Sequence, residues 1–214
     1  MKSLTFWFDP VSPFAHLAFE QLPQALQGLS YEVSYRPVLF AGLLGHWGQK
    51  GPAEIEPKRA WTFRHALWLA RRHGVRLQMP VAHPFNPLAL LRLAIASAPA
   101  DSTPSRYVCE RILRHVWQGG LATDDPQRLA ELTSAIAPQR DPHSADVKQQ
   151  LRAATEGAAA LGVFGVPTIA VDGKLFWGLD SLEMLAHYLS GDAMFDEADW
   201  VTAGQARPAV HRRA

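Results

Sequence analysis

A serine–proline pair, Ser12-Pro13, lies directly after an apolar and aromatic run that is typical of a buried strand. Pro13 suits the first position of a helix, where its missing N–H costs nothing, and Ser12 then occupies the N-cap. The free N–H groups and the dipole of a helix start favour an anion. A thiolate bound there would have its pKa lowered, and the Ser12 hydroxyl could donate a hydrogen bond to it. The simpler alternative is an ordinary cap without a ligand.

A second candidate is the turn Gly165-Val166-Pro167-Thr168, which leads into another apolar run. An X-Pro bond before a strand can be cis, although only a few per cent of X-Pro bonds are, so the isomer of the Val166-Pro167 bond stays open. With a cis bond, the backbone N–H and C=O of Val166 would face outward, where they could pair with an extended, peptide-like ligand. The alternative is a rigid loop with no ligand.

A third candidate is the segment Asp180-Ser181-Leu182-Glu183. Asp180 followed three residues later by Glu183 resembles a capping box, which is a sufficient structural explanation. The functional alternative uses the Asp180 carboxylate to bind an ammonium group and the helix N-terminus to bind a carboxylate. A free amino-acid head group carries both of these charges.

The elements that must position these turns follow from hydrophobic spacing. The start predicts a strand over 4–8, a helix from 14 to 26 and a strand over 31–39, which a right-handed crossover makes parallel. The end predicts strands over 168–171 and 174–177, joined by a type I′ turn at Asp172-Gly173, and a helix over 181–189. The middle lacks any strand pattern and predicts helices over 60–72, 87–97, 105–117, 126–136 and 146–160.

This order predicts an α/β, thioredoxin-like fold with an all-helical insertion. We expect a discontinuous domain of residues 1–58 and 161–200, an insertion of residues 59–160, and a tail of residues 201–214. The three candidate turns would then surround one cleft. A thiol, a peptide backbone and an α-amino-acid head are the three parts of glutathione.

Composition excludes several function classes. The chain has 214 residues, a formal net charge of +1 and 48% hydrophobic residues, so no strong field points to nucleic acid or to an anionic membrane. No run reaches the length of a membrane span, and the start lacks the pattern of a signal peptide. The basic residues near the end, Arg207, His211, Arg212 and Arg213, indicate a frayed, solvated terminus.

The single cysteine, Cys109, lies in a helical pattern and is expected to be a buried, inert thiol. One cysteine cannot form an internal disulfide or a dithiol redox pair, and it fits a reducing compartment such as the cytoplasm. His16, His65, His73 and His115 share no metal-ligand spacing, so no metal is expected.

The motifs also resemble a known family. The resemblance rests on Phe8-Asp9-Pro10-Val11-Ser12-Pro13-Phe14-Ala15-His16-Leu17-Ala18, Lys58-Arg59, His83-Pro84-Phe85-Asn86-Pro87, Gly162-Val163-Phe164-Gly165-Val166-Pro167-Thr168 and Val171-Asp172-Gly173-Lys174-Leu175-Phe176-Trp177-Gly178-Leu179-Asp180. Together they are similar to 2-hydroxychromene-2-carboxylate isomerases and kappa-class glutathione transferases, over residues 3 to 190. The wider superfamily is DsbA-like, and Ser12-Pro13-Phe14-Ala15 takes the place of its Cys-x-x-Cys.

The resemblance implies a role for each turn. Ser12 would hold the glutathione sulfur, Val166 before Pro167 would pair with the cysteinyl backbone, and Asp180 with Ser181 would take the γ-glutamyl end. Further cleft or aromatic-substrate candidates are Lys58, Asn86 and Trp177, although Asn86 would also serve as a helix cap and Lys58 as a solvated charge.

This sequence departs from the family pattern at three places. Gln49 stands where the family often has asparagine, Ser181 where arginine is common, and Leu179 where a polar residue is common. Gln49 would replace that asparagine at longer reach.

Three functions stay open at this point. The first is a glutathione-dependent isomerase of an aromatic keto-acid, and the second is a kappa-like transferase that conjugates small electrophiles. The third is a non-catalytic module that binds glutathione or a peptide. The family resemblance implies a homodimer, for which no motif is visible.

Overall fold

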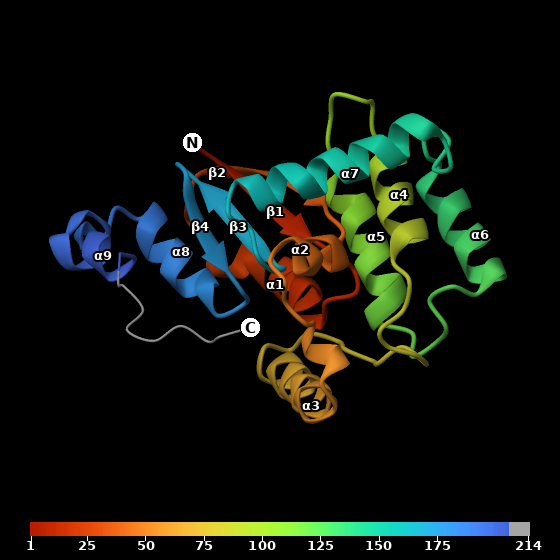
Figure 1. The fold of residues 1–214 in the computed structure, drawn as a ribbon, viewed down its shortest axis with the longest axis horizontal. Coiled ribbons are helices and arrows are strands. Elements are labelled where there is room, and N and C mark those ends of the chain that lie inside the picture. Colours follow the sequence, from red (N-terminus) through yellow and green to blue (C-terminus); the bar gives the residue numbers. More distant parts are fainter. Residues whose placement is uncertain (206–214) are drawn as a thin grey trace.

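The computed structural model describes residues 1–205 and contains a mixed sheet in the strand order β2-β1-β3-β4 (Figure 1). The strands are β1 (Lys2–Phe8), β2 (Tyr31–Pro37), β3 (Thr168–Val171) and β4 (Lys174–Trp177). The basic residues Arg207, His211, Arg212 and Arg213 lie outside the described residues. The fold is the thioredoxin-like arrangement that the sequence predicts.

The β-α-β start is confirmed. Strands β1 and β2 are parallel, with Lys2 opposite Tyr31, and α1 (Pro13–Ala25) connects them. Strand β2 ends at Pro37, two residues before the predicted end, and beyond it the Leu39 N–H donates to the Thr155 hydroxyl and the Phe40 N–H to the Asp9 carboxylate. A helix that the sequence analysis did not predict, α2 (Phe40–His46), begins there.

The β-β-α finish is also confirmed. Strand β3 is antiparallel to both β1 and β4. Asp172 and Gly173 have φ angles of 50° and 75°, the positive values that a type I′ turn needs. Helix α8 (Ser181–Leu189) follows, and then the short elements η2 (Ala193–Asp196) and α9 (Ala198–Ala203).

Between β2 and β3, the regular elements that the structure describes are all helices. Besides α2, these are η1 (Pro52–Glu54), α3 (Glu56–Arg72), α4 (Leu88–Ala96), α5 (Arg106–Trp117), α6 (Pro126–Ile136) and α7 (Ala145–Ala160). Helix α3 begins four residues before the predicted start, since Pro57 suits the first turn. The domain boundaries stay a prediction. Among residues 1–205, no helix combines the length and apolar character needed to cross a bilayer.

The two faces of β1 pack into separate cores, which fixes the layers. Phe6 and Phe8 belong to the larger core, together with residues of α1, α5 and α8. Trp7 belongs to a second core with Ala158 and Ala159 of α7. In Figure 1 α7 crosses above the sheet and α3 lies below α1, with which it is in contact, since the ring centroids of Phe14 and His65 are 5.8 Å apart.

Candidate functional site

The turn between β1 and α1 places Ser12 at the helix N-terminus. Ser12 has the extended backbone of an N-cap, and its Oγ accepts a hydrogen bond from the Ala15 N–H at 3.2 Å. Pro13 occupies the first turn, so the predicted cap is confirmed. The Phe14 N–H finds no acceptor within residues 1–205. This helix start therefore presents a free donor and a hydroxyl to the same space.

The turn before β3 lies against Ser12. The Val166-Pro167 bond is cis, which answers the question that the sequence left open. The Ser12 hydroxyl donates to the Val166 carbonyl at 3.2 Å, which is longer than the usual ~2.7–2.8 Å between two oxygens. Both residues are buried. Two turns that are distant in the sequence thus share a weak hydrogen bond.

The third turn joins this pair through the backbone. The Gly178 N–H donates to the Pro167 carbonyl at 2.9 Å, and the Ser181 hydroxyl donates to the Gly178 carbonyl at 2.8 Å. These two bonds connect the N-terminus of α8 to the proline turn. A continuous series of hydrogen bonds connects all three turns.

Of the two alternatives for Asp180 and Glu183, the structure does not form the capping box. Asp180 has helical rather than extended backbone angles, and its side chain makes no cap hydrogen bond. Ser181 fixes the turn instead, through the bond to Gly178. The exposed Asp180 carboxylate is consequently not used by the helix and is free to meet a ligand.

Trp177 forms an aromatic surface beside the proline turn. Its indole lies so close to Gly165 that a Cβ there would come within 2.6 Å of Nε1. Its ring centroid is 4.8 Å from that of Phe164, and 54% of Trp177 remains exposed. Only glycine at position 165 permits this approach, and Trp177 and Phe164 together leave an exposed aromatic surface.

Gln49 is exposed and lies in a loop attached to the same region. Two residues earlier, the Trp47 indole N–H donates to the Val163 carbonyl at 3.0 Å, which ties this loop to the segment before Val166. In the described part of the chain, the Gln49 side chain itself has no hydrogen bond to another turn of the site.

Lys58 and Asn86 lie on the side of the insertion. Lys58 is exposed in the first turn of α3. Asn86 is exposed and its Oδ1 accepts from the Leu88 N–H at 3.1 Å, a turn just before α4, whose N-cap is Pro87. Within residues 1–205, neither side chain forms a hydrogen bond with Ser12.

Asp9 is a buried carboxyl group that the sequence analysis did not select. It accepts hydrogen bonds from the N–H groups of Val11 and Phe40, both at 2.9 Å. Burial raises its pKa to about 7, against the opposite effect of the two hydrogen bonds. The only sequence signal was a carboxylate at the end of a buried strand. Asp9 fixes the shape of the turn that carries Ser12.

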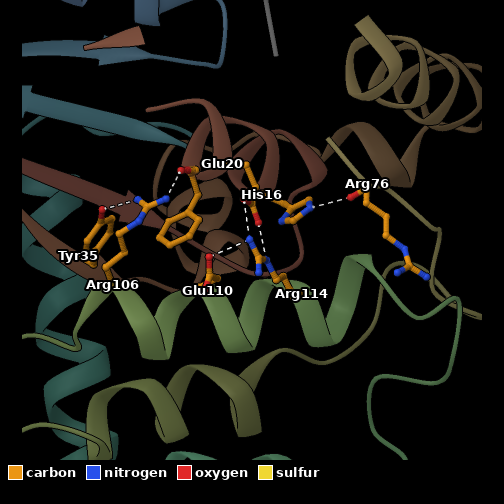
Figure 2. Close-up of polar contacts among 8 residues, drawn as sticks. His16, Glu20, Tyr35, Arg76, Arg106, Glu110 and Arg114 are labelled. Carbon is orange, nitrogen blue, oxygen red and sulfur yellow. Dashed lines mark hydrogen bonds and ion pairs between the residues drawn. The ribbon is translucent and has the colours of Figure 1, made fainter. Parts of the chain in front are cut away.

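Polar contacts hold the buried face of α1 against the insertion (Figure 2). One ring nitrogen of His16 lies 3.2 Å from the Arg76 carbonyl and must donate to it, and Glu20 pairs with Arg114 of α5 at 2.8 Å. Burial lowers the pKa of His16, which favours the neutral form of its ring. These contacts anchor α1 one and two turns beyond Ser12.

Cys109 is fully buried in α5, as expected, and burial raises the pKa of its thiol. It lies in the larger core rather than at the site. Residues 1–205 bring together no group of three or more metal-ligating side chains.

Comparisons with known proteins agree with this geometry. Residues 3–190 match the family model described as the DSBA-like thioredoxin domain. The chain is 27% identical to 2-hydroxychromene-2-carboxylate isomerase of Sphingobium xenophagum, over 88% of this chain and 98% of the relative. It is 28% identical to glutathione S-transferase kappa 1 of Homo sapiens, over 88% and 91%. A solved 2-hydroxychromene-2-carboxylate isomerase shares the fold, with a TM-score of 0.77, 22% identity and coverage of 92% and 98%.

Proposed function

This chain belongs to the DSBA-like thioredoxin domain family, and we propose on that premise that it binds glutathione and uses it to isomerise a small aromatic keto-acid. The observation that carries the proposal is the series of hydrogen bonds from Ser12 through the Val166-Pro167 turn to Ser181. The names of two relatives, an isomerase and a glutathione transferase, support this chemistry.

Each part of glutathione has a partner in this arrangement. The sulfur takes the N-terminus of α1, beside the Ser12 hydroxyl and the free Phe14 N–H. The cysteinyl backbone pairs with Val166, and the γ-glutamyl ammonium group meets the exposed Asp180 carboxylate. Gln49 approaches the same ligand from its loop.

Binding of the thiolate changes the partners of Ser12. A hydroxyl group has one proton, and that proton now bonds the Val166 carbonyl over a long 3.2 Å. When the hydroxyl turns to the thiolate, it forms a stronger, charge-assisted bond. The Val166 carbonyl is then released to accept the cysteinyl N–H, so one rotation completes both contacts.

The reaction needs a thiolate and a positioned substrate. The thiolate adds to a conjugated carbon of the keto-acid and forms a C–S bond, and a bond in the adduct rotates. The same C–S bond then breaks, which restores the thiolate, so glutathione acts as a cofactor. The Lys58 ammonium group neutralises the substrate carboxylate. Asn86 lines the insertion side, and Trp177 packs on the aromatic ring.

A kappa-like transferase is the second candidate, because the human transferase is as similar as the isomerase. Incubation with glutathione and a chromene carboxylate separates them. The isomerase predicts a change in substrate absorbance at constant glutathione concentration, whereas a transferase consumes glutathione. A non-catalytic binding module predicts binding without either change.

We also propose a homodimer, which the family resemblance implies, and a cytoplasmic location, which the single cysteine supports. Light scattering on the purified chain tests the first, and a mass equal to one chain contradicts it. Fractionation of the source cells tests the second.

A further inference from the structure

Two side chains from the helical insertion reach the turn that carries Ser12. The Trp117 indole Nε1–H, at the end of α5, donates to the Pro10 carbonyl at 2.9 Å. The His83 Nε2 lies 2.7 Å from the Val11 carbonyl. A carbonyl oxygen only accepts, so His83 carries its proton on Nε2. The two consecutive carbonyls before Ser12 are therefore both held by the insertion.

Both donors are themselves fixed by packing. Trp117 is fully buried. The His83 ring lies 4.9 Å from Phe63, 6.0 Å from Phe85 and 5.8 Å from Trp117, and its other nitrogen, Nδ1, is buried without a partner within residues 1–205. An aromatic ring that packs against three others has little freedom to move, so its N–H group points in a fixed direction.

We propose that His83 and Trp117 are positioning residues that orient the Ser12 turn, and with it the anion-binding end of α1. Their N–H groups satisfy two carbonyl oxygens whose negative ends would otherwise lie near the bound anion. They also fix which way the peptides preceding Ser12 face, and hence where the N–H groups of the first helical turn point. The inference deepens the proposed function and rests on it for the identity of the anion.

A reporter cysteine tests the inference without glutathione. The variant Ser12→Cys places a thiol at the helix start, and the rate of its alkylation by iodoacetamide against pH gives its pKa. The native Cys109 is fully buried, and burial raises its pKa, so it stays silent. We expect the reporter to have a pKa below the ordinary ~8.5 of a free cysteine.

His83→Phe is then added to the reporter. Phenylalanine keeps an aromatic ring among the three neighbours but removes the N–H donor. We expect the reporter pKa to rise by about 0.5–1 unit. His83→Gln, which restores an N–H donor, is expected to return most of that change, and Trp117→Phe is expected to raise the reporter pKa as well.

His115→Phe is the matched control. His115 also lies in the insertion and donates from Nε2 to a carbonyl, that of Thr123, at 3.0 Å. It does not touch the Ser12 turn. Its loss should lower the free energy of unfolding, measured in urea, while the reporter pKa stays unchanged.

Equal reporter pKa values in the presence and absence of His83→Phe overturn the inference, as does a change matched by His115→Phe. Failure of the proposed function gives a different result. The wild-type chain would then show no glutathione binding in calorimetry, while His83→Phe would still raise the reporter pKa. In the wild-type background, His83→Phe should also weaken glutathione binding about 3- to 10-fold.

Discussion

The Ser12 hydroxyl and the Val166 carbonyl share a hydrogen bond although 154 residues separate them in the sequence. The same oxygen also accepts from the Ala15 N–H, so Ser12 serves the helix and the proline turn at once. A ligand that competes for the hydroxyl proton leaves the helix cap intact, because the cap uses only the lone pairs of that oxygen. The site can therefore bind an anion without unravelling α1.

Removal of the hydroxyl by Ser12→Ala separates its two roles. We expect a loss of about 1 kcal/mol in the free energy of unfolding from the lost cap. We also expect a rise in the pKa of the bound glutathione thiol, because one donor to the thiolate is gone. Thiolate absorbance of the complex against pH measures this, and the isomerisation rate should fall with it.

Ser105→Ala is the control for this experiment. Ser105 caps α5 in the same way, by accepting from the Val108 N–H at 3.3 Å. The variant Ser105→Ala should lower the free energy of unfolding by a similar amount and leave the pKa of the bound glutathione thiol unchanged. If the two variants behave alike in the thiol measurement, Ser12 is a cap alone.

Asp180→Asn tests the γ-glutamyl end. Asp180 is exposed and makes no cap hydrogen bond, so the change should leave the free energy of unfolding nearly unaltered. Loss of the charge pair with the ligand ammonium group should weaken glutathione binding about tenfold, which corresponds to about 1.4 kcal/mol. Isothermal calorimetry measures both the affinity and the heat.

Glu183→Gln removes the same charge from the same helical turn and serves as the control. Glu183 is exposed in the first turn of α8. A similar loss of affinity in both variants would mean that the general field, and not a contact with Asp180, attracts the ligand.

Local signals were sufficient for most elements of the fold. Ser12-Pro13 marked the start of α1, and Asp172-Gly173 marked the hairpin, because each needs a backbone conformation that few residues favour. Helix α2 was not predicted, because its local sequence signals are weak and a distant residue fixes its start. Gly42 and Gly45 lower its helix propensity, and its start depends on a long-range bond from the Phe40 N–H to Asp9.

The same distinction between local signals and long-range contacts applies to the candidate site. The turns that carry Ser12, Val166 and Asp180 were identified from residue types at element ends. The supporting residues were not, since His83 and Trp117 act through backbone carbonyls far away in the sequence. A side chain that donates to a backbone carbonyl leaves no recognisable pattern in the sequence, because every residue type has that carbonyl. The sequence could not exclude the capping-box alternative for Asp180, because it does not reveal the backbone angles of that residue.

Trp177→Leu tests the aromatic-substrate surface. Trp177 is half-exposed, and it contacts the proline turn through Gly165 and Phe164. We expect the KM for the aromatic substrate to rise several-fold, because a stacking face worth about 0.5–1.5 kcal/mol is lost. The affinity for glutathione should stay within about twofold. Trp61→Leu, which removes an exposed indole from α3, is the control and should leave the KM unchanged.

The last prediction concerns the pH dependence that Asp9 gives to stability. Burial raises the pKa of Asp9 to about 7 in the folded chain, whereas an unfolded aspartate titrates near ~3.9. Between these values the folded state binds one more proton than the unfolded state. The contribution of Asp9 is therefore fully present below about pH 4 and is lost as the pH rises through about 7. Asp9→Asn cannot ionise and should lack this loss.

Three histidines have the opposite effect on how the free energy of unfolding changes with pH. Burial lowers the pKa values of His16, His83 and His115. Their contribution is present above the unfolded value of about 6.5 and is lost at lower pH. Because the wild-type curve contains both effects, the quantity to measure is the difference between the unfolding free energies of wild type and Asp9→Asn.

Urea unfolding followed by tryptophan fluorescence, between about pH 5 and pH 8, gives this difference. Taken as wild type minus variant, it should fall with rising pH and level off once Asp9 is ionised in both states. The same difference for His115→Phe should rise with pH and level off above about 6.5. A difference for Asp9→Asn that does not depend on pH would mean that the carboxyl is already ionised in the folded chain. The two N–H donors from Val11 and Phe40 would then outweigh its burial.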